Sequence, residues 1–204
     1  MIKSNVKVCG TISRAAVVRA NKDGKQFTTY AIDVVLLPKS GINRTINVSV
    51  IKDGGNQEEA AKYQVGSRIE AEGVLLFKKR GSDIYFDLSE TAVDLYPVET
   101  KDAITGEMNF RGTVGKGIEM KNDKKGKPYL SFSAYSAEKV QDGFEYTWVR
   151  FIRFSGEKED FLEEKANIEA KGELDLSVYN DKLNIGCRLA ELSKWEKQPY
   201  QPNR

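Results

Sequence analysis

The feature that most constrains this chain is an internal duplication with a period close to one hundred residues. Three segments recur in the same order: 8–12 at 110–114, 24–27 at 126–129, and 69–73 at 168–172. The first two pairs are offset by 102 residues (110 − 8) and the third by 99 (168 − 69). Three ordered matches at nearly one spacing predict two copies of one domain. A period of this length is the size of a small domain and is too long for a solenoid repeat.

Both copies contain the same order of elements, which predicts an all-β fold. In the second copy we expect a short amphipathic helix at 157–165 and strands at 108–114, 129–136, 146–154, 168–176 and 183–189. The first copy repeats this order, with its helix at 57–63. Three strands, one helix and two further strands is the order of the OB-fold, a five-stranded Greek-key barrel. We therefore predict two tandem OB-fold barrels, each with a short helix between its third and fourth strands.

The domain boundaries follow from a polar segment between the two copies. Residues 97–106 contain Pro97 and Gly106 and show no sustained periodicity, as is typical of a linker. We predict a first OB-fold domain at 1–98, a linker at 99–106, a second OB-fold domain at 107–195 and a C-terminal tail at 196–204.

The composition argues against catalysis and against a metal site. The chain has no histidine, which is the commonest general base and metal ligand, and Cys9 and Cys187 do not have a metal-ligand spacing. We therefore expect two reduced cysteines, no enzyme activity, no cofactor, no metal and no small-molecule substrate. With 32 basic and 30 acidic residues, a nucleic-acid binder of this composition must gather its cations on one face.

The location of the protein is predicted from two further patterns. No stretch approaches the roughly 20 apolar residues that a membrane helix needs, so no membrane association is expected. The first residues pass directly into a strand-like pattern without the apolar core of a signal peptide, which predicts a cytoplasmic location.

Three motifs of the second copy resemble the bacterial single-stranded-DNA-binding protein (SSB) family. They are GKPYLSFS at 126–133, YTWVRF at 146–151 and IEAKGEL at 168–174, and the similarity covers nearly all of residues 107–195. The resemblance implies sequence-independent binding of single-stranded DNA in replication, repair or mobile-element transfer. Because SSB assemblies commonly present four OB domains, it also implies a homodimer of this two-domain chain.

The resemblance also implies roles for individual residues. Trp148 and Phe154 match the aromatic residues that stack on bases, and Arg150 matches a basic residue that holds the backbone. Tyr179 is similar to the aromatic residue of the loop between strands 4 and 5.

This chain also departs from the SSB pattern at several places. The segment 177–182 is shorter than the family's loop, and the C-terminus lacks the acidic, phenylalanine-terminated tail that recruits partner proteins. Sequence matching places Ile46 and Val48 of the first copy at the positions of Trp148 and Arg150. We therefore expect the first copy to bind DNA weakly or to serve in assembly.

The alternation along 148–154 supports the same interpretation on physical grounds. Trp148 and Arg150 fall on one side of the predicted strand, and Val149 and Phe151 fall on the other. A small barrel has one interior, so one set must face outward, and the set with tryptophan and arginine is the better candidate. A surface that binds single strands needs π faces for the bases and cations for the phosphates. The alternative is that Trp148 lies in the core.

Further candidates lie on the same face or at a charged hairpin. Tyr129 and Tyr135 fall opposite Phe132 in the alternation, and Phe27 occupies the place of Tyr129 in the first copy. The hairpin of the first copy offers cations flanked by aromatic residues: Phe77, Lys78, Lys79, Arg80 and Tyr85. The alternatives are ordinary surface tyrosines and a hairpin tip that serves only solubility.

Other OB-fold functions stay open at this point. A primosome-like or RNA-binding OB protein would use the same kind of surface. An OB protein-interaction module would suit the first copy, which is poor in aromatic residues on its third strand. An OB-fold nuclease is disfavoured, because the chain has no histidine and no paired carboxylates.

Overall fold

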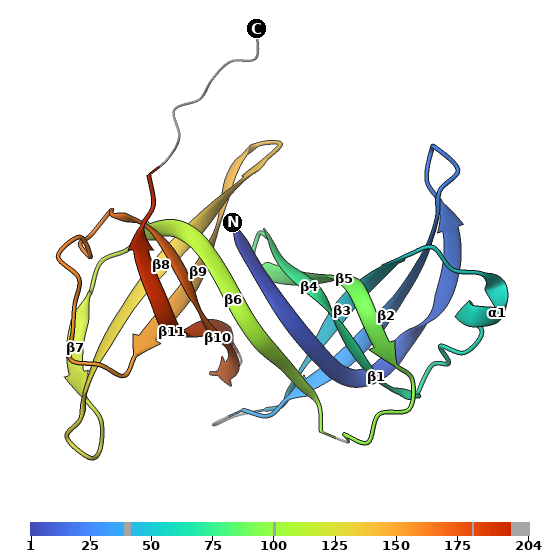
Figure 1. Cartoon of the computed structure of the whole chain (residues 1–204), viewed down its shortest axis with the longest axis horizontal. Helices are drawn as coiled ribbons and strands as arrows, with labels where there is room; N and C mark the ends of the chain where they lie inside the picture. The colour runs from blue at the N-terminus through green and yellow to red at the C-terminus, as the bar shows by residue number, and fades with distance from the viewer. Residues whose placement is uncertain (39–41, 100, 181, 197–204) are drawn as a thin grey trace, which may run out of the picture.

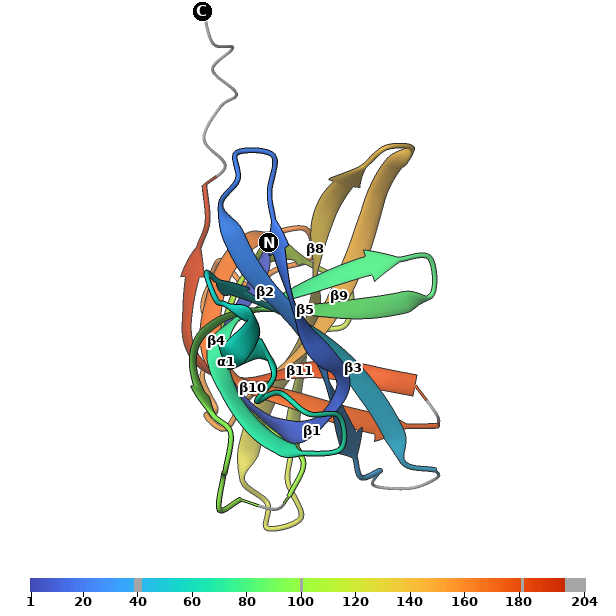
Figure 2. The same ribbon diagram turned by 90° about the vertical axis from the view of Figure 1, so that its right-hand side faces the viewer.

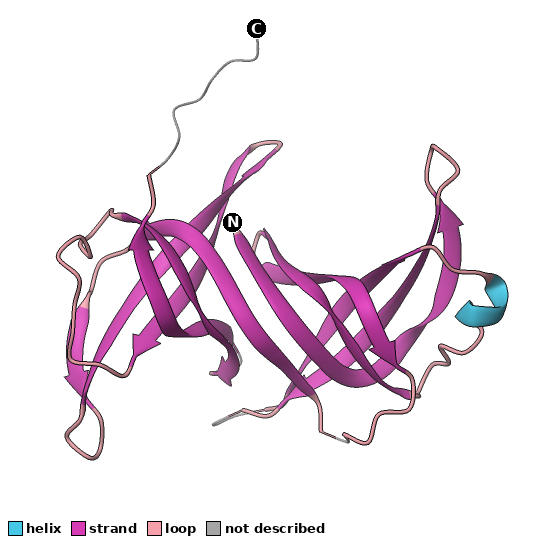
Figure 3. Ribbon diagram, in the orientation of Figure 1, coloured by secondary structure: helices cyan, strands magenta, loops and turns pink. Residues whose placement is uncertain are grey.

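The computed structural model describes residues 1–38, 42–99, 101–180 and 182–196, so the expected tail lies outside it apart from Glu196. These residues form two β-barrels that lie side by side, with a helix on the outer side of the first (Figures 1 and 3). No helix in the described ranges is long and apolar enough to cross a membrane.

The first barrel has the strand order of an OB-fold. Its elements are β1 (Ile2–Ala20), β2 (Gln26–Leu36), β3 (Arg44–Asp53), α1 (Gln57–Ala60), β4 (Arg68–Arg80) and β5 (Asp83–Asp94). The sheet order β1–β2–β3–β5–β4 closes on itself because β4 pairs with β1. All pairs are antiparallel except β3 with β5, which the chain connects through α1 and β4. The prediction of an OB barrel is confirmed.

The second barrel repeats this topology. Its strands are β6 (Ala103–Val114), β8 (Pro128–Val140), β9 (Gly143–Arg153), β10 (Asn167–Tyr179) and β11 (Lys182–Lys194), with a short extra strand β7 (Glu119–Asn122) beside β8. The order β6–β8–β9–β11–β10 closes through the pairing of β10 with β6. The parallel pair is now β9 with β11. Duplication is therefore visible in the strand order as well as in the sequence.

The expected helix of the second copy is not present. Residues 157–165 form turns, and Leu162 alone of this segment is fully buried in the core. In the first copy the Asn56 side chain accepts the N–H of Glu59 and caps α1. In the second copy the Arg153 guanidinium donates to the Glu157 carbonyl at 2.6 Å, and the Leu162 N–H donates to the Glu159 carbonyl three residues earlier, as in a turn. Amphipathic spacing alone was not sufficient to form a helix here.

Inward-facing residues at period two fill each barrel. In the second barrel Phe132 stacks on Phe151 with ring centroids 5.0 Å apart, and Phe110 meets Phe151 edge-on at 5.0 Å. In the first barrel Tyr30 occupies the place of Phe132 and packs against Tyr63 at 4.8 Å. These fully buried rings dominate the apolar area removed from water, at about 25 cal/mol per Å².

The two barrels are joined by a strand pairing. Strand β1 pairs antiparallel with β6 from Ile2 opposite Phe110 to Cys9 opposite Ala103, which makes one continuous sheet of the described strands. Strand β6 begins at Ala103, within the segment 99–106 that the sequence predicts as a linker. The Asp102 carboxylate accepts the Val35 N–H at 2.6 Å and forms an ion pair with Arg68. The connection between the barrels is held against the first barrel.

This seam predicts a strong effect of substituting Gly106. Gly106 lies opposite Val6 with φ of +154°, and a Cβ there would approach the Asn5 carbonyl oxygen to 2.0 Å. We expect Gly106→Ala to lower the free energy of unfolding by about 2–4 kcal/mol, measured by urea denaturation. Gly117→Ala is the control. Gly117 has a φ of +81°, and a Cβ added there would meet no atom, so backbone strain alone lowers the free energy of unfolding, by about 1 kcal/mol. Equal losses in the two variants would contradict close packing of the seam.

Candidate nucleic-acid interface

Strand β9 places an aromatic and a basic side chain on the outer face of the second barrel. Trp148 is 51% exposed and Arg150 is also exposed, whereas Val149 and Phe151 are buried. The predicted division of the strand into two faces is confirmed, and Trp148 is not a core residue. Phe154 directly follows the strand and is 68% exposed.

Trp148 belongs to a cluster of aromatic rings. Tyr135 on β8 lies directly opposite Trp148 in register, with ring centroids 5.0 Å apart. Tyr135 also meets Tyr146 edge-on at 5.4 Å, and Tyr146 is 44% exposed. Tyr146 was not among the predicted site residues, although the alternation 146, 148, 150 puts it on the same face. We call Tyr135, Tyr146 and Trp148 the aromatic cluster.

Gly115, directly after the end of β6, leaves room for the Trp148 ring. A Cβ at Gly115 would lie 2.7 Å from Cζ3 and 2.9 Å from Cη2 of the Trp148 ring. The Gly115 N–H also donates to the Ser133 carbonyl at 2.8 Å. The six-membered ring of the indole therefore lies where a side chain at position 115 would be, and the half-exposed Trp148 stays accessible for stacking.

A second pair of rings lies further along the same face. Tyr129 on β8 and Phe154 have centroids 6.1 Å apart, and Arg150 lies on β9 between this pair and the aromatic cluster. Arg150 forms no ion pair with the residues the structure describes, whereas Arg153 and Arg188 do. Its guanidinium is available to an anion.

Arg150 also influences a nearby carboxylate. The ammonium of Lys121, hydrogen-bonded to Glu119 across 2.5 Å, is the main cause of the lowered pKa of Glu119, and the charge of Arg150 adds to it. Arg150 is therefore close enough to Glu119 for the two charges to interact, although it forms no ion pair with it.

Tyr146, Trp148, Arg150 and Phe154 line a groove of about 700 Å³, whereas Tyr129 and Tyr135 are not part of its lining. One wall is β9, with Trp148, Arg150 and Phe154, and a second wall is the β10–β11 hairpin, with Tyr179 at its tip. Tyr179 is exposed on the last residue of β10. Asp175 is the one carboxylate among the described lining residues. Aromatic and basic side chains thus line one side of the groove.

Cys187 lies at the base of this groove as a free, buried thiol. Burial, with a smaller effect of the Glu107 charge, raises the pKa of this thiol to about 12. A thiol of this kind is not a nucleophile at neutral pH. Among the described residues, no three histidine, cysteine, aspartate or glutamate side chains are grouped as a metal site.

The side chains of the predicted basic hairpin of the first barrel lie partly in the core and partly on the surface. Phe77 is only 6% exposed and packs edge-on against Phe86 at 5.5 Å, so its inclusion in the interface was wrong. It continues the inward set of β4, two residues after Leu75. Arg80 lies over the ring of Tyr85 at 5.6 Å, and Tyr85 is exposed.

The two lysines of this hairpin differ in their surroundings. Lys78 forms an ion pair with Asp87 at 2.6 Å. Lys79 lines the groove of the second barrel and donates to the Tyr146 carbonyl at 3.2 Å. The structure therefore brings Lys79, and not Lys78, to the aromatic cluster.

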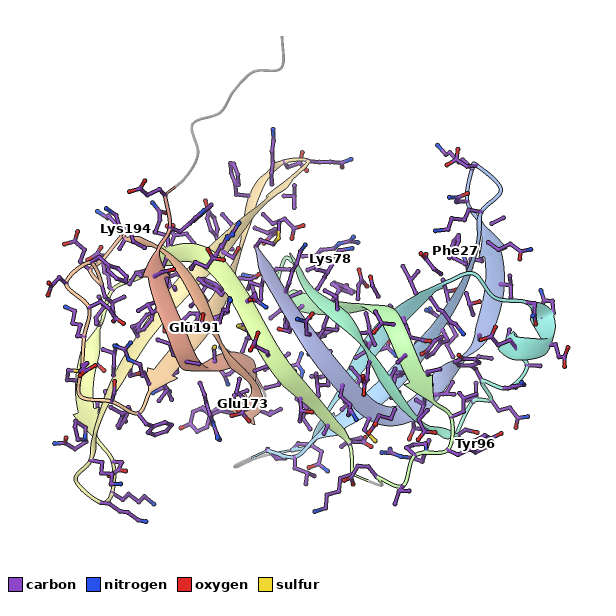
Figure 4. The ribbon with its side chains drawn as sticks, in the orientation of Figure 1. Phe27, Lys78, Tyr96, Glu173, Glu191 and Lys194 are labelled. Carbon is purple, nitrogen blue, oxygen red and sulfur yellow. The ribbon has the colours of Figure 1, made fainter. Side chains whose placement is uncertain are left out.

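Phe27 does not join this surface. It lies on β2 of the first barrel, on the side of the molecule remote from the second barrel (Figure 4). It is only partly exposed.

The first barrel has a different set of residues at the equivalent of the aromatic cluster. Tyr30 pairs with Val50 as Phe132 pairs with Phe151. Each residue of β3 therefore corresponds to the residue of β9 that lies 101 positions later (151 − 50). Sequence matching at 102 was therefore one residue out of register. Ile46 and Val48, which it placed at Trp148 and Arg150, are buried in the core. A slip of one residue exchanges the two faces of a strand.

The true counterparts of Trp148 and Tyr135 are polar. Asn47 lies opposite Asp33, and its amide donates to the Asp33 carboxylate at 2.6 Å and to the Ser13 hydroxyl at 3.1 Å. Ser13 takes the place of Gly115. The first barrel thus carries a hydrogen-bonded, acidic cluster where the second carries aromatic rings, and it offers no stacking surface there.

Comparisons with known proteins give structural similarities alone. No family model and no curated protein matches the sequence. The single-stranded DNA binding protein from Thermus aquaticus aligns over 98% of this chain and 96% of its own, with 15% identity and a TM-score of 0.47. The mitochondrial single-stranded DNA binding protein of S. cerevisiae covers 46% of this chain and 96% of its own (14% identity, TM-score 0.36). PriB from Ralstonia solanacearum aligns over 45% of this chain and 98% of its own, with 12% identity and a TM-score of 0.34. With TM-scores below 0.5, the OB assignment here rests on strand order and register.

The contact between Gly115 and Trp148 predicts a spectroscopic change. We expect Gly115→Ala to displace the indole and shift its fluorescence emission, with little effect on the urea midpoint because the ring can move outward. Trp195 is the other tryptophan, so both proteins are measured in a Trp195→Phe background. An unchanged emission spectrum would show that the ring does not lie over Gly115.

Proposed function

We propose that this protein binds single-stranded DNA without sequence preference along the groove of the second barrel. The observation that carries the proposal is the exposed aromatic cluster, followed along β9 by Arg150 and by the Tyr129–Phe154 pair. Bases have π faces whatever their identity, so stacking is tolerant of sequence and contributes roughly 1–3 kcal/mol per base. Cations beside the rings hold the phosphates between stacked bases.

The groove supports a binding role over a catalytic one. Hydrolysis of a phosphodiester requires paired carboxylates, a histidine or a metal, and the chain has no histidine. The groove offers Asp175 without a second carboxylate among its described lining residues, and its Cys187 thiol is protonated. We propose a non-enzymatic protein that protects single strands during replication, repair or mobile-element transfer.

The central prediction concerns Trp148. Trp148→Ala removes one stacking surface, so we expect the affinity for oligo-dT to fall by about 5- to 150-fold, measured by anisotropy of a labelled oligonucleotide. Asn47→Ala is the matched control, because Asn47 is the counterpart of Trp148 in the first barrel, and its affinity should equal that of the wild type.

Three results would contradict parts of this proposal. Equal affinities for Trp148→Ala and wild type would remove the aromatic cluster from the interface. Tighter binding of a matched RNA strand would favour an RNA-binding OB protein. Cleavage of the oligonucleotide in the presence of Mg²⁺ would show a nuclease.

We also propose that two chains associate, giving an assembly with four OB domains. Light scattering should then give twice the chain mass of 22.9 kDa. A single species at the mass of one chain would overturn the dimer and leave the binding proposal unaffected.

A further inference from the structure

The groove of the second barrel has a wall that belongs to the first barrel. Besides β9 and the β10–β11 hairpin, its lining includes Lys79, Ser82 and Ile84 from the β4–β5 hairpin. Figure 2 shows this hairpin projecting from the same side of the molecule as the β8–β9 and β10–β11 hairpins. A groove built from two domains is a common position for a binding site.

The position of this wall is fixed by contacts between the barrels. The Lys79 ammonium donates to the Tyr146 carbonyl at 3.2 Å, and the Gly81 N–H donates to the Glu145 carboxylate at 3.2 Å. The β1–β6 pairing behind the groove joins the barrels into one sheet. The β4–β5 hairpin therefore contacts the β8–β9 hairpin at two neighbouring positions, over a continuous sheet.

Lys79 retains donors for a ligand. An ammonium group has three N–H donors, and the Tyr146 carbonyl occupies one of them. Lys79 forms no ion pair with the described residues, while the adjacent Lys78 is paired with Asp87. Since neighbouring residues of a strand point to opposite faces, only one of the two lysines lines the groove.

The charge of the first barrel is arranged differently on its own counterpart face. There the cluster of Ser13, Asp33 and Asn47 presents a carboxylate that would repel phosphate. The cation that the first barrel contributes to the groove is Lys79 of its β4–β5 hairpin.

We propose that the two barrels form a single composite site, in which Lys79 of the first barrel binds a backbone phosphate of the strand whose bases stack on Tyr146 and Trp148 of the second. This inference rests on the proposed function. The first barrel then acts in cis as one wall of the second barrel's groove, and one strand is held between the two barrels.

The test compares two neighbouring lysines that carry the same charge. Oligo-dT binding is measured by anisotropy for the wild type, Lys79→Ala and Lys78→Ala over a range of salt concentrations. We expect Lys79→Ala to weaken binding by about 3- to 10-fold and to reduce the slope of log K against log salt by about 0.7, the value for one phosphate contact on a single strand. Lys78→Ala should change both quantities much less, and Lys79→Arg should restore the slope.

The outcomes separate this inference from the proposed function. If Lys79→Ala matches Lys78→Ala while Trp148→Ala loses affinity, the composite site is overturned and the stacking groove stands. A loss of affinity in Lys79→Ala without any change of slope would mean that Lys79 only positions the hairpin, which also overturns the phosphate contact. No binding by the wild type would end both proposals. Thermal unfolding curves of the variants that match the curve of the wild type exclude misfolding as the cause.

Discussion

The antiparallel pairing of β1 with β6 is the interaction on which the rest of the arrangement depends. Each barrel closes through its own hydrogen bonds, and this seam joins the two into one sheet, where the hairpin contacts of Lys79 and Gly81 add to it in setting how one barrel faces the other. It brings the β4–β5 hairpin of the first barrel against β9 of the second, and the groove acquires its third wall as a result. Gly106 permits the close approach of the two backbones, and Asp102 holds the connecting segment beside Arg68. The candidate site is thus a property of the pair of barrels.

Duplication has left two barrels with the same strands and different surfaces. At equivalent positions the outer face carries Ser13, Asp33 and Asn47 in one copy and Gly115, Tyr135 and Trp148 in the other. The interior differs as well. The Tyr30 hydroxyl donates to Glu90, whose pKa is raised by burial, whereas the second copy has Phe132 and Leu189 at these places. The first copy has polar groups inside and outside, and the second has aromatic rings gathered on one face.

Much of the fold and part of the site could be predicted from the sequence, because both depend on short periods. The alternation along β9 is sufficient to separate Trp148 from Val149, and the repeated order of elements is sufficient for the OB topology. Three features depend on information that local patterns do not contain. The one-residue register change before β3 hid Asn47, the inward direction of Phe77 depends on the pairing of β4, and the approach of Lys79 to Tyr146 depends on long-range packing. The segment 157–165, expected as a helix, instead contains turns with backbone bonds from Leu162 to Glu159 and from Ala166 to Glu163, which amphipathic spacing does not distinguish from a helix.

The seam also has a consequence for how the chain is made. The first half of β1 is hydrogen-bonded on both sides, to β4 within its barrel and to β6 across the seam. A ribosome releases β4, which ends at Arg80, before β6, so the outer edge of residues 2–9 stays without its second neighbour until Ala103–Phe110 has emerged. An open strand edge is a template for pairing with another chain. The order of synthesis therefore exposes this edge for a limited interval, and the second barrel covers it from within the same molecule.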